Sequence, residues 1–231
     1  MQIHHHLTLP STQDEAARLA ADGAPDGTVV SADAQTAGRG RHNRTWVSPS
    51  GNLHLTLLLR PSVPIHGWPE LSFVAALALA ETLGCYLPGR VRLKWPNDVL
   101  ADTAKLGGIL IEQSHGAVLV GIGVNVAHTP EAPYPVTSLA AEMSPDAPPT
   151  PAQLRDDLLL NIQRWRLRWE SDGFDPIRTA WLNLAHSIGT RLRISETGQS
   201  GLFAGLDTSG ALLLDTPDGR VRILAGHVAM V

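Results

Sequence analysis

The sequence predicts an α+β fold, with helices and strands interspersed up to residue 187 and a small all-β module over residues 188–231. Apolar residues recur at helical spacing in some segments before residue 187 and alternate in others, which predicts both kinds of element there. After His186 the chain runs through short alternating stretches divided by Gly, Asp, Thr and Ser, a pattern typical of short strands and tight turns. With 231 residues, the chain is long enough for one substantial core or for one large domain and a small appendage, and length alone does not decide between them.

The first elements to be expected are a helix and two strands. Ser11 and Thr12 are each followed three residues later by an acid, which is typical of a capping box, so we expect a helix from about residue 12 to 22. The sequence TVVSADAQ then indicates a buried strand, and NLHLTLLLR indicates a longer one. The arginine-rich loop QTAGRGRHNRTW is therefore expected to connect two strands.

The middle of the chain predicts a helix, a short strand and a hairpin. The segment WPELSFVAALALAETLG is typical of an apolar helix that ends near Gly84. The segment VRLKW is typical of a short strand, which Pro96 ends, so Lys94 is expected at a strand end. GGILIEQSHGAVLVGIGVNV predicts a hairpin with SHG as its turn. Gly121 and Gly123 in its second strand indicate that something approaches the backbone closely there.

The following segment changes from irregular to helical. Residues 127–151 are rich in proline and are expected to form an irregular surface connection. Thr150, Pro151 and Gln153 supply an N-cap, a first-turn proline and a capping-box glutamine for a helix with regularly spaced apolar residues. A second helix is expected around residues 174–186.

Charge and composition exclude several classes of function. The formal net charge of −4 provides no general positive field for holding nucleic acid or an anionic membrane. Because no apolar run reaches about 18 residues and the start MQIHHHLTLP lacks the regions of a signal peptide, we expect a soluble, cytoplasmic protein. The only cysteine, Cys85, suits a reducing compartment and is expected to be buried. Three histidines at 4–6 alternate faces in an extended segment, so we predict no metal site there.

The arginine-rich loop is the most unusual stretch of the sequence. Gly38 and Gly40 let the backbone turn sharply and approach a ligand, while Arg39, Arg41 and Arg44 offer planar, permanently charged donors that suit phosphate or carboxylate. The residues alone leave open whether the loop is an anion clamp or a solvated basic loop. A nucleic-acid-binding segment is the third alternative, which the negative net charge disfavours.

Two further stretches carry candidate chemistry. VRLKWPND holds Lys94 beside a sharp turn, and Asn125 lies within the otherwise apolar strand GIGVNV, where a buried side-chain amide needs hydrogen-bond partners. The sequence contains no Gly-x-x-x-x-Gly-Lys-Ser/Thr phosphate loop, no His/Cys metal spacing and no Gly-x-Ser-x-Gly elbow. An anion bound by this protein would therefore meet arginines, a lysine and backbone amides.

Five motifs follow one another within residues 11–125, namely STQ, Q followed by AGRGRxxRxW, KWPND, KLGGILIE and GxGxN. In this order they resemble the motifs of the biotin protein ligase family. The resemblance implies a mixed-sheet catalytic domain of the class II synthetase-like type over 1–187 and an SH3-like barrel over 188–231. It implies an enzyme that activates biotin as biotinyl-5′-AMP and transfers it to a lysine of a biotin carboxyl carrier protein. ATP and Mg²⁺ would be co-substrates, with no permanently bound cofactor.

The resemblance also implies particular roles for individual residues. Lys94 and Arg41 would be catalytic, and the residues that bind biotin or its adenylate would be Ser11, Thr12, Gln13, Gln35, Arg39, Gly40, Arg41 and Lys94. Gly38, Trp46 and Asn125 would lie on the nucleotide side, and no residue is expected to bind a metal. The loop should be mobile when empty and ordered by the adenylate, and His42 and Asn43, where many relatives have glycine, should affect its mobility.

Partners and alternatives follow from the same comparison. Because the Ser-Thr motif begins at position 11, no N-terminal DNA-binding domain and no contact with DNA are expected. The charge and the lack of a long apolar run predict no membrane partner, and a monomer and a homodimer both stay open. The nearest alternative is a lipoate or octanoate ligase or transferase of the same fold. A more distant one is a non-catalytic module that binds a nucleotide or a nucleic acid.

Overall fold

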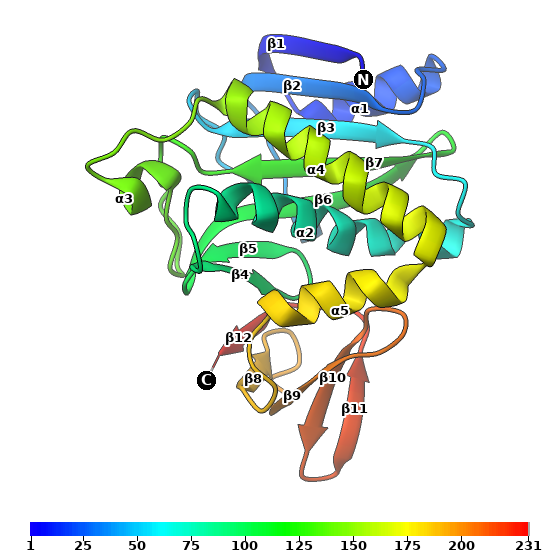
Figure 1. The fold of residues 1–231 in the computed structure, drawn as a ribbon, viewed down its shortest axis with the longest axis vertical. Coiled ribbons are helices and arrows are strands. Elements are labelled where there is room, and N and C mark those ends of the chain that lie inside the picture. The colour runs from blue at the N-terminus through cyan, green and yellow to red at the C-terminus, as the bar shows by residue number, and fades with distance from the viewer. Residues whose placement is uncertain (231) are drawn as a thin grey trace.

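The computed structural model describes residues 1–230, without the side chains of Asn43 and Met230, and it contains two β-sheets (Figure 1). The larger sheet has the strand order β1-β2-β3-β7-β6-β5-β4, with β1 and β2 parallel and all other neighbours antiparallel. Its strands are β1 (Ile3–Leu9), β2 (Thr28–Gln35), β3 (Leu53–Leu59), β4 (Val91–Lys94), β5 (Asp98–Ala101), β6 (Ala104–Ser114) and β7 (Ala117–Val124). This mixed sheet confirms the predicted fold class.

The smaller sheet is antiparallel and lies at the C-terminal end of the chain, with the strand order β11-β10-β9-β8-β12. Its strands are β8 (Arg191–Ile194), β9 (Ser200–Leu206), β10 (Leu212–Thr216), β11 (Gly219–Ile223) and β12 (Val228–Met230). The sheet confirms the expected all-β module. The predicted boundary at residue 187 falls in the connection that precedes β8.

Helices cover the two faces of the larger sheet unequally. They are α1 (Thr12–Ala21), α2 (Leu71–Gly84), α3 (Leu139–Met143), α4 (Pro151–Asp172) and α5 (Phe174–Leu184), together with 3-10 turns at Arg41–Asn43 and Ile65–Glu70. Figure 1 shows α2 and α4 across one face, where the main apolar core lies. The helix α1 packs on the other face against Val30, Leu58 and Leu119, in a separate small cluster. This second face stays partly open, and the candidate site lies there.

Local sequence signals placed the starts of α1 and α4 correctly. The Ser11 hydroxyl caps α1 by accepting from the Gln13 backbone N–H, and Thr150 and Gln153 form the predicted capping box of α4. The strands β1 and β5 and the short helix α3 were not predicted. The expectation for Cys85 was wrong, because its side chain is exposed just after α2.

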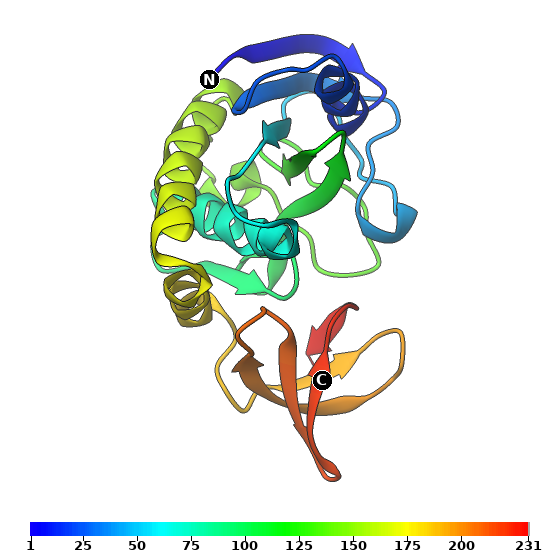
Figure 2. The ribbon, with the colours of Figure 1, turned by 90° about the vertical axis from the view of Figure 1, so that its right-hand side faces the viewer.

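The smaller sheet is fixed to the larger domain by shared apolar packing. The Trp95 indole N–H donates to the backbone oxygen of Gly210 at 3.0 Å. Phe73 of α2 meets Phe174 and Trp181 of α5 edge to face, at ring-centroid distances of 5.2 and 5.5 Å. A Cβ at Gly210 would lie 2.7 Å from the Phe73 ring, so only glycine allows this approach. Figure 2 shows the smaller sheet below the larger domain.

Within residues 1–230, none of the helices combines the length and the apolar character that crossing a bilayer requires.

Candidate active site

A cavity of about 250 Å³ opens on the face of the larger sheet that α1 covers only in part. Its walls come from the start of α1, the β2–β3 loop, the sheet strands β4 to β7, the segment before α3 and the edge of the smaller sheet. The lining includes Ser11, Thr12, Gln13, Gln35, Arg39, Gly40, Arg41, Arg44, Trp46, Lys94, Asn97, Asp98, Lys105, Tyr134, Ser195 and His227. Nine of the predicted site residues are therefore brought together here, from Ser11 to Lys94.

Glycines in β7 create the space for this cavity. Gly121 and Gly123 point toward the α1 face, while their neighbours Val120 and Val124 belong to the core on the other side. A Cβ at Gly121 would lie 3.1 Å from the Gln13 side chain, and one at Gly123 only 2.5 Å from the Trp46 indole. The predicted close approach is confirmed, and the groups that approach are two side chains of the cavity wall.

A buried polar network forms the end of the cavity beside α1. The Thr12 hydroxyl accepts from Thr56 at 2.9 Å and donates to Gln35 Oε1 at 3.1 Å, and the same Gln35 oxygen accepts from the Thr12 backbone N–H. Gln35 Nε2 donates to the Ser48 hydroxyl at 2.8 Å. Both ends of the Gln35 amide are thus engaged within the protein, so Gln35 positions Thr12 and the loop that follows β2.

Two buried polar atoms of this wall have no partner within the described residues. Gln13 is 4% exposed, and its Nε2 donates weakly to the Leu110 backbone oxygen at 3.4 Å, while its Oε1 accepts nothing. The Trp46 Nε1–H likewise donates to no group in residues 1–230. An unpaired buried polar atom is costly, and both residues line the cavity, so a ligand with a matching donor and acceptor would satisfy them.

The other end of the cavity carries Lys94, the last residue of β4. Its ammonium group is half-buried, and no carboxylate of the described chain lies within ion-pair distance of it. Burial lowers the pKa of Lys94, and the nearby positive charge of Lys105 lowers it further, while Asp98 opposes both effects. Lys94 therefore presents to the cavity a partly desolvated positive charge that no carboxylate of the described chain contacts directly.

Asp98 and Lys105 form a separate ion pair at 2.6 Å between β5 and β6. The Lys105 ammonium also lies 5.5 Å from the Trp46 ring centroid and 6.0 Å from that of Tyr134. These aromatic contacts and the ion pair hold Lys105 against the wall. Asp98 is consequently occupied by Lys105 and is 17% exposed in its side chain, which leaves Lys94 as the freer cation.

The loop over the cavity, which we call the lid (residues 36–47), is a narrow hydrogen-bonded finger. The Trp46 backbone N–H donates to the Gly38 oxygen at 2.9 Å, and the Gly40 N–H donates to the Arg44 oxygen at 2.7 Å. A bridge between Arg39 and Thr45 joins its two arms. A Cβ at Gly38 would lie 2.6 Å from the Trp46 backbone oxygen, so this glycine is needed for the narrow turn.

Arg39 and Arg41 of the lid have different environments. Arg39 pairs with Glu112 at 2.9 Å and Asp14 at 2.6 Å, and these carboxylates raise its pKa although burial opposes them. Among the groups that the structure describes, Arg41 donates only to the neutral oxygens of Asn97 at 3.3 Å and Gly226 at 3.4 Å. Burial lowers the pKa of Arg41. Arg39 thus fastens the lid, and Arg41 keeps its charge available to the cavity.

Two predicted residues, Gly38 and Asn125, lie outside the cavity lining. Asn125 is 1% exposed, and its Nδ2 donates to the Thr137 backbone oxygen at 3.0 Å, which ties the end of β7 to the segment before α3. Its Oδ1 has no partner within the described residues. The nucleotide-side role of both residues stays a prediction, and the side chain of Asn43 lies outside what the structure describes.

Sequence reasoning missed the contribution of the smaller sheet. Ser195, His227, Val228 and Ala229 line the cavity, and the Gly226 backbone oxygen accepts from Arg41. No local signal marks these positions, because their place depends on how the two sheets pack.

Asn97 was missed within KWPND, although an amide beside a proline turn was a recognisable candidate. Its Nδ2 donates to the Ile109 oxygen at 2.6 Å while its Oδ1 accepts from Arg41.

Known proteins share this arrangement over the whole chain. Residues 7–127 match the family model described as the biotin/lipoate A/B protein ligase family, and residues 191–231 match the biotin protein ligase C-terminal domain. A biotin–acetyl-CoA-carboxylase ligase from Paracoccus denitrificans is 42% identical over 232 residues, covering 94% of this chain and 96% of that protein.

More distant relatives agree. A ligase of the same name from Mycobacterium tuberculosis is 33% identical, covering 96% of this chain and 85% of that protein. A solved structure of biotin protein ligase from Aquifex aeolicus in complex with biotin and ATP superimposes with a TM-score of 0.87 at 27% identity, covering 100% of this chain and 98% of that chain. Since the motifs, the two-sheet fold and the matched lengths all agree, the chain belongs to the biotin protein ligase family.

Proposed function

We propose that this protein is an ATP-dependent ligase that activates biotin as biotinyl-5′-AMP and then transfers it to a lysine of a biotin carboxyl carrier protein. In the first step the biotin carboxylate attacks the α-phosphate of Mg-ATP and displaces pyrophosphate. In the second step the lysine amine attacks the acyl carbon and displaces AMP, which forms an amide. The location in the cytoplasm and a biotin carboxyl carrier protein as the acceptor are predictions from the sequence.

The observation that carries this proposal is the chemical difference between the two ends of the cavity. Beside α1, the unpaired Gln13 Oε1 can accept from an N–H of a ureido ring, and Thr12 offers a hydroxyl there. Gln13 packs against Gly121 of β7, whereas Lys94 lies on β4. Three strand spacings separate β7 from β4, which is about 14 Å at ordinary strand spacing. A substrate with a cyclic urea at one end and a carboxylate at the other fits both groups at once.

The first step brings a carboxylate toward a polyphosphate, so its main barrier is the repulsion between two anions. Lys94 and Arg41 are proposed to contact the carboxylate and the α-phosphate. Neither has a carboxylate partner in the described chain, and the same holds for Arg44 of the lid, which also lines the cavity. Lys94 and Arg41 are already in place and partly desolvated, so little reorganisation is needed when negative charge develops. Positioning of the two reactants in one closed cavity supplies the remaining advantage.

The second step requires that the mixed anhydride waits for its amine without being hydrolysed. We propose that the lid excludes water during this interval, with Arg39 holding it to Asp14 and Glu112. The nucleotide is proposed to occupy the part of the cavity beside Trp46, where the free indole N–H and the flat ring suit a purine base.

Transfer to a purified biotin carboxyl carrier domain tests the function directly. The protein is incubated with the domain, ATP, Mg²⁺ and biotin, and the product is detected by streptavidin blotting. We expect labelling that requires both ATP and biotin, and no labelling of a carrier domain whose acceptor lysine is replaced by arginine. Efficient transfer of lipoate to a lipoyl domain in a parallel reaction, with none of biotin, would instead support the alternative of the same fold.

A further inference from the structure

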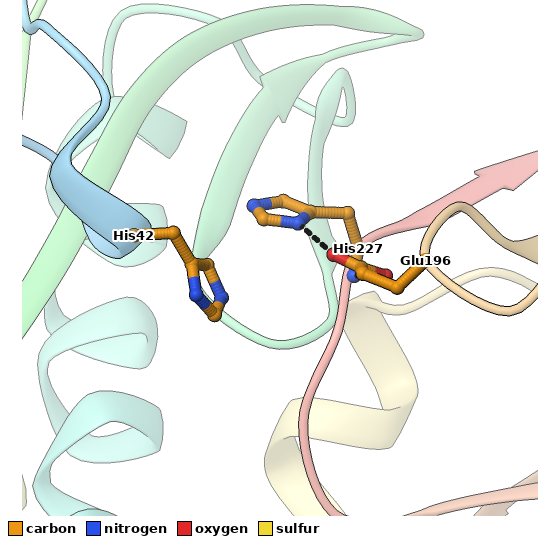
Figure 3. A group of neighbouring side chains, drawn as sticks. All are labelled: His42, Glu196 and His227. Carbon is orange, nitrogen blue, oxygen red and sulfur yellow. Dashed lines mark hydrogen bonds and ion pairs between the residues drawn. The ribbon is translucent and has the colours of Figure 1, made fainter.

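Three side chains that are far apart in the sequence meet where the lid touches the smaller sheet. His42 comes from the lid, Glu196 from the β8–β9 turn and His227 from the residue before β12 (Figure 3). One ligand atom from each lies within 4.8 Å of the other two. The rings of His42 and His227 lie 5.2 Å apart, and His227 Nδ1 is hydrogen-bonded to Glu196 at 2.5 Å.

The donor types in this group are those that first-row transition metals prefer. Two imidazole nitrogens and a carboxylate oxygen bind Zn²⁺ at about 2.0–2.2 Å, with a fourth position left to water. In a tetrahedral site such ligand atoms lie about 3.4 Å apart. His42 has to move inward by up to about 1.4 Å to reach this spacing, and the His227 and Glu196 atoms, now hydrogen-bonded at 2.5 Å, have to separate by about 0.9 Å as their shared proton leaves. The exposed position of His42 at the tip of the lid allows its movement.

We propose that His42, Glu196 and His227 form a transition-metal site, best suited to Zn²⁺, that fastens the lid to the smaller sheet. The function described above needs no such ion, because its Mg²⁺ enters with ATP. The site is formed only when the lid is closed, since His42 is the one ligand that the lid contributes. Metal binding and lid closure are therefore linked, and each stabilises the other.

The surrounding charges set an upper limit on the affinity. Arg41 and Arg44 act on His227 and oppose a dication, whereas Glu196 supplies one negative charge. The proton shared by His227 and Glu196 must leave when the metal enters. With three ligands and two nearby cations, we expect micromolar rather than nanomolar binding.

A metal at this place would slow the opening of the lid, and this consequence for turnover rests on the proposed function. A fastened lid retains the adenylate and delays entry of the acceptor lysine. Zn²⁺ should therefore lower the rate of multiple-turnover biotinylation more than it lowers a single round of adenylate formation. Mg²⁺, which prefers oxygen ligands, should not replace Zn²⁺ in this effect.

Zn²⁺ binding is measured first, on tag-free protein without biotin or ATP, by competition with a chromophoric zinc chelator. Because His4, His5 and His6 are histidines outside the proposed site, where no metal is expected, His5→Ala serves as the matched control. We expect His42→Ala and His227→Ala each to remove the same equivalent of zinc, and His5→Ala to leave it in place. Equal zinc binding by the wild type and His42→Ala would overturn the proposal.

Trypsin cleavage within the lid reports its closure independently of catalysis, since Arg41 and Arg44 are cleavage sites. Zn²⁺ should slow cleavage there at least severalfold in the wild type, EDTA should restore it, and His42→Ala should show no zinc effect. Cleavage that zinc leaves unchanged in the wild type would refute the fastening role. Because neither assay contains biotin or ATP, their failure would leave the proposed ligase function standing, and absence of biotinylation would leave the zinc site standing.

Discussion

Replacing Lys94 by alanine should disable adenylate formation while leaving the fold intact. The ammonium group is half-buried at the end of β4, without a carboxylate partner in the described chain, so its charge is available to a bound anion. At about 4 Å and an effective dielectric constant of about 20, one such charge contributes about 4 kcal/mol to binding an anion. This value agrees with the cost of about 2.7–4 kcal/mol for losing a preorganised oxyanion donor. We therefore expect Lys94→Ala to lower turnover about 10²–10³-fold.

The assay is biotin-dependent exchange of labelled pyrophosphate into ATP, which isolates the first step from carrier transfer. Arg92→Ala is the matched control, because Arg92 lies two residues earlier on the same strand, points to the same side and is exposed. We expect Arg92→Ala to exchange at nearly the wild-type rate. Exchange by Lys94→Ala within about threefold of wild type would refute the reasoning that this cation stabilises the transition state.

The same residue predicts a pH dependence. Burial lowers the pKa of Lys94 below its ordinary value of 10.5, and the protonated form is the active one. Activity is therefore present below this lowered pKa and is lost as the pH rises through it. We expect kcat/KM for adenylation, which reports the free enzyme, to fall at a lower pH than an ordinary lysine would give. Lys94→Arg should move this fall of kcat/KM to higher pH, because a guanidinium group stays protonated. If the fall occurs at the same pH in Lys94→Arg and in the wild type, a group other than Lys94 causes it.

Three further substitutions test the remaining parts of the site. Gln13→Met keeps the chain length but removes the unpaired acceptor, so KM for biotin should rise about fivefold, corresponding to about 1 kcal/mol, and an unchanged KM would remove Gln13 from the biotin subsite. Gly123→Ala places a Cβ 2.5 Å from the Trp46 indole, so KM for ATP should rise and the free energy of unfolding should fall by about 1–3 kcal/mol. In the control Gly84→Ala, the added Cβ meets nothing within 4 Å, so exchange assays and thermal melts should show neither effect. Arg39→Ala removes the two ion pairs of the lid, so trypsin should cut the ligand-free lid severalfold faster, and equal cleavage rates would contradict its fastening role.

Local patterns were sufficient for most elements of the fold. The Ser11 and Thr150 caps predicted the starts of α1 and α4, and the alternation before and after SHG predicted the β6–β7 hairpin. These signals act over a few residues and depend little on the rest of the chain. The strand β1 is less evident, because its histidines and threonine give no apolar periodicity and it is stabilised by parallel pairing with β2. Cys85 was misjudged because apolar neighbours in sequence do not imply burial at a helix end.

The site was predictable as a set of residues but not as an arrangement. Chemical type identified Arg39 and Arg41 as equivalent anion ligands, and nothing in the loop sequence separates them. The difference arises from distant partners, since Glu112 of β6 lies within reach of Arg39, whereas Arg41 faces Asn97 and the backbone oxygen of Gly226. The role of the smaller sheet was inaccessible for the same reason, because packing of one sheet against another is a tertiary property.

The division between Arg39 and Arg41 explains how a protein with net negative charge can build a cationic cavity. A cation that holds the lid shut must be neutralised by carboxylates, otherwise it would compete for the substrate anions, and two carboxylates surround Arg39. A cation that acts on the reacting groups must lack such partners and must be partly desolvated, as Arg41 and Lys94 are. Exchanging these environments should therefore reverse the roles. In an Asn97→Asp variant the new carboxylate would pair with Arg41, and adenylation should slow although every cation is retained.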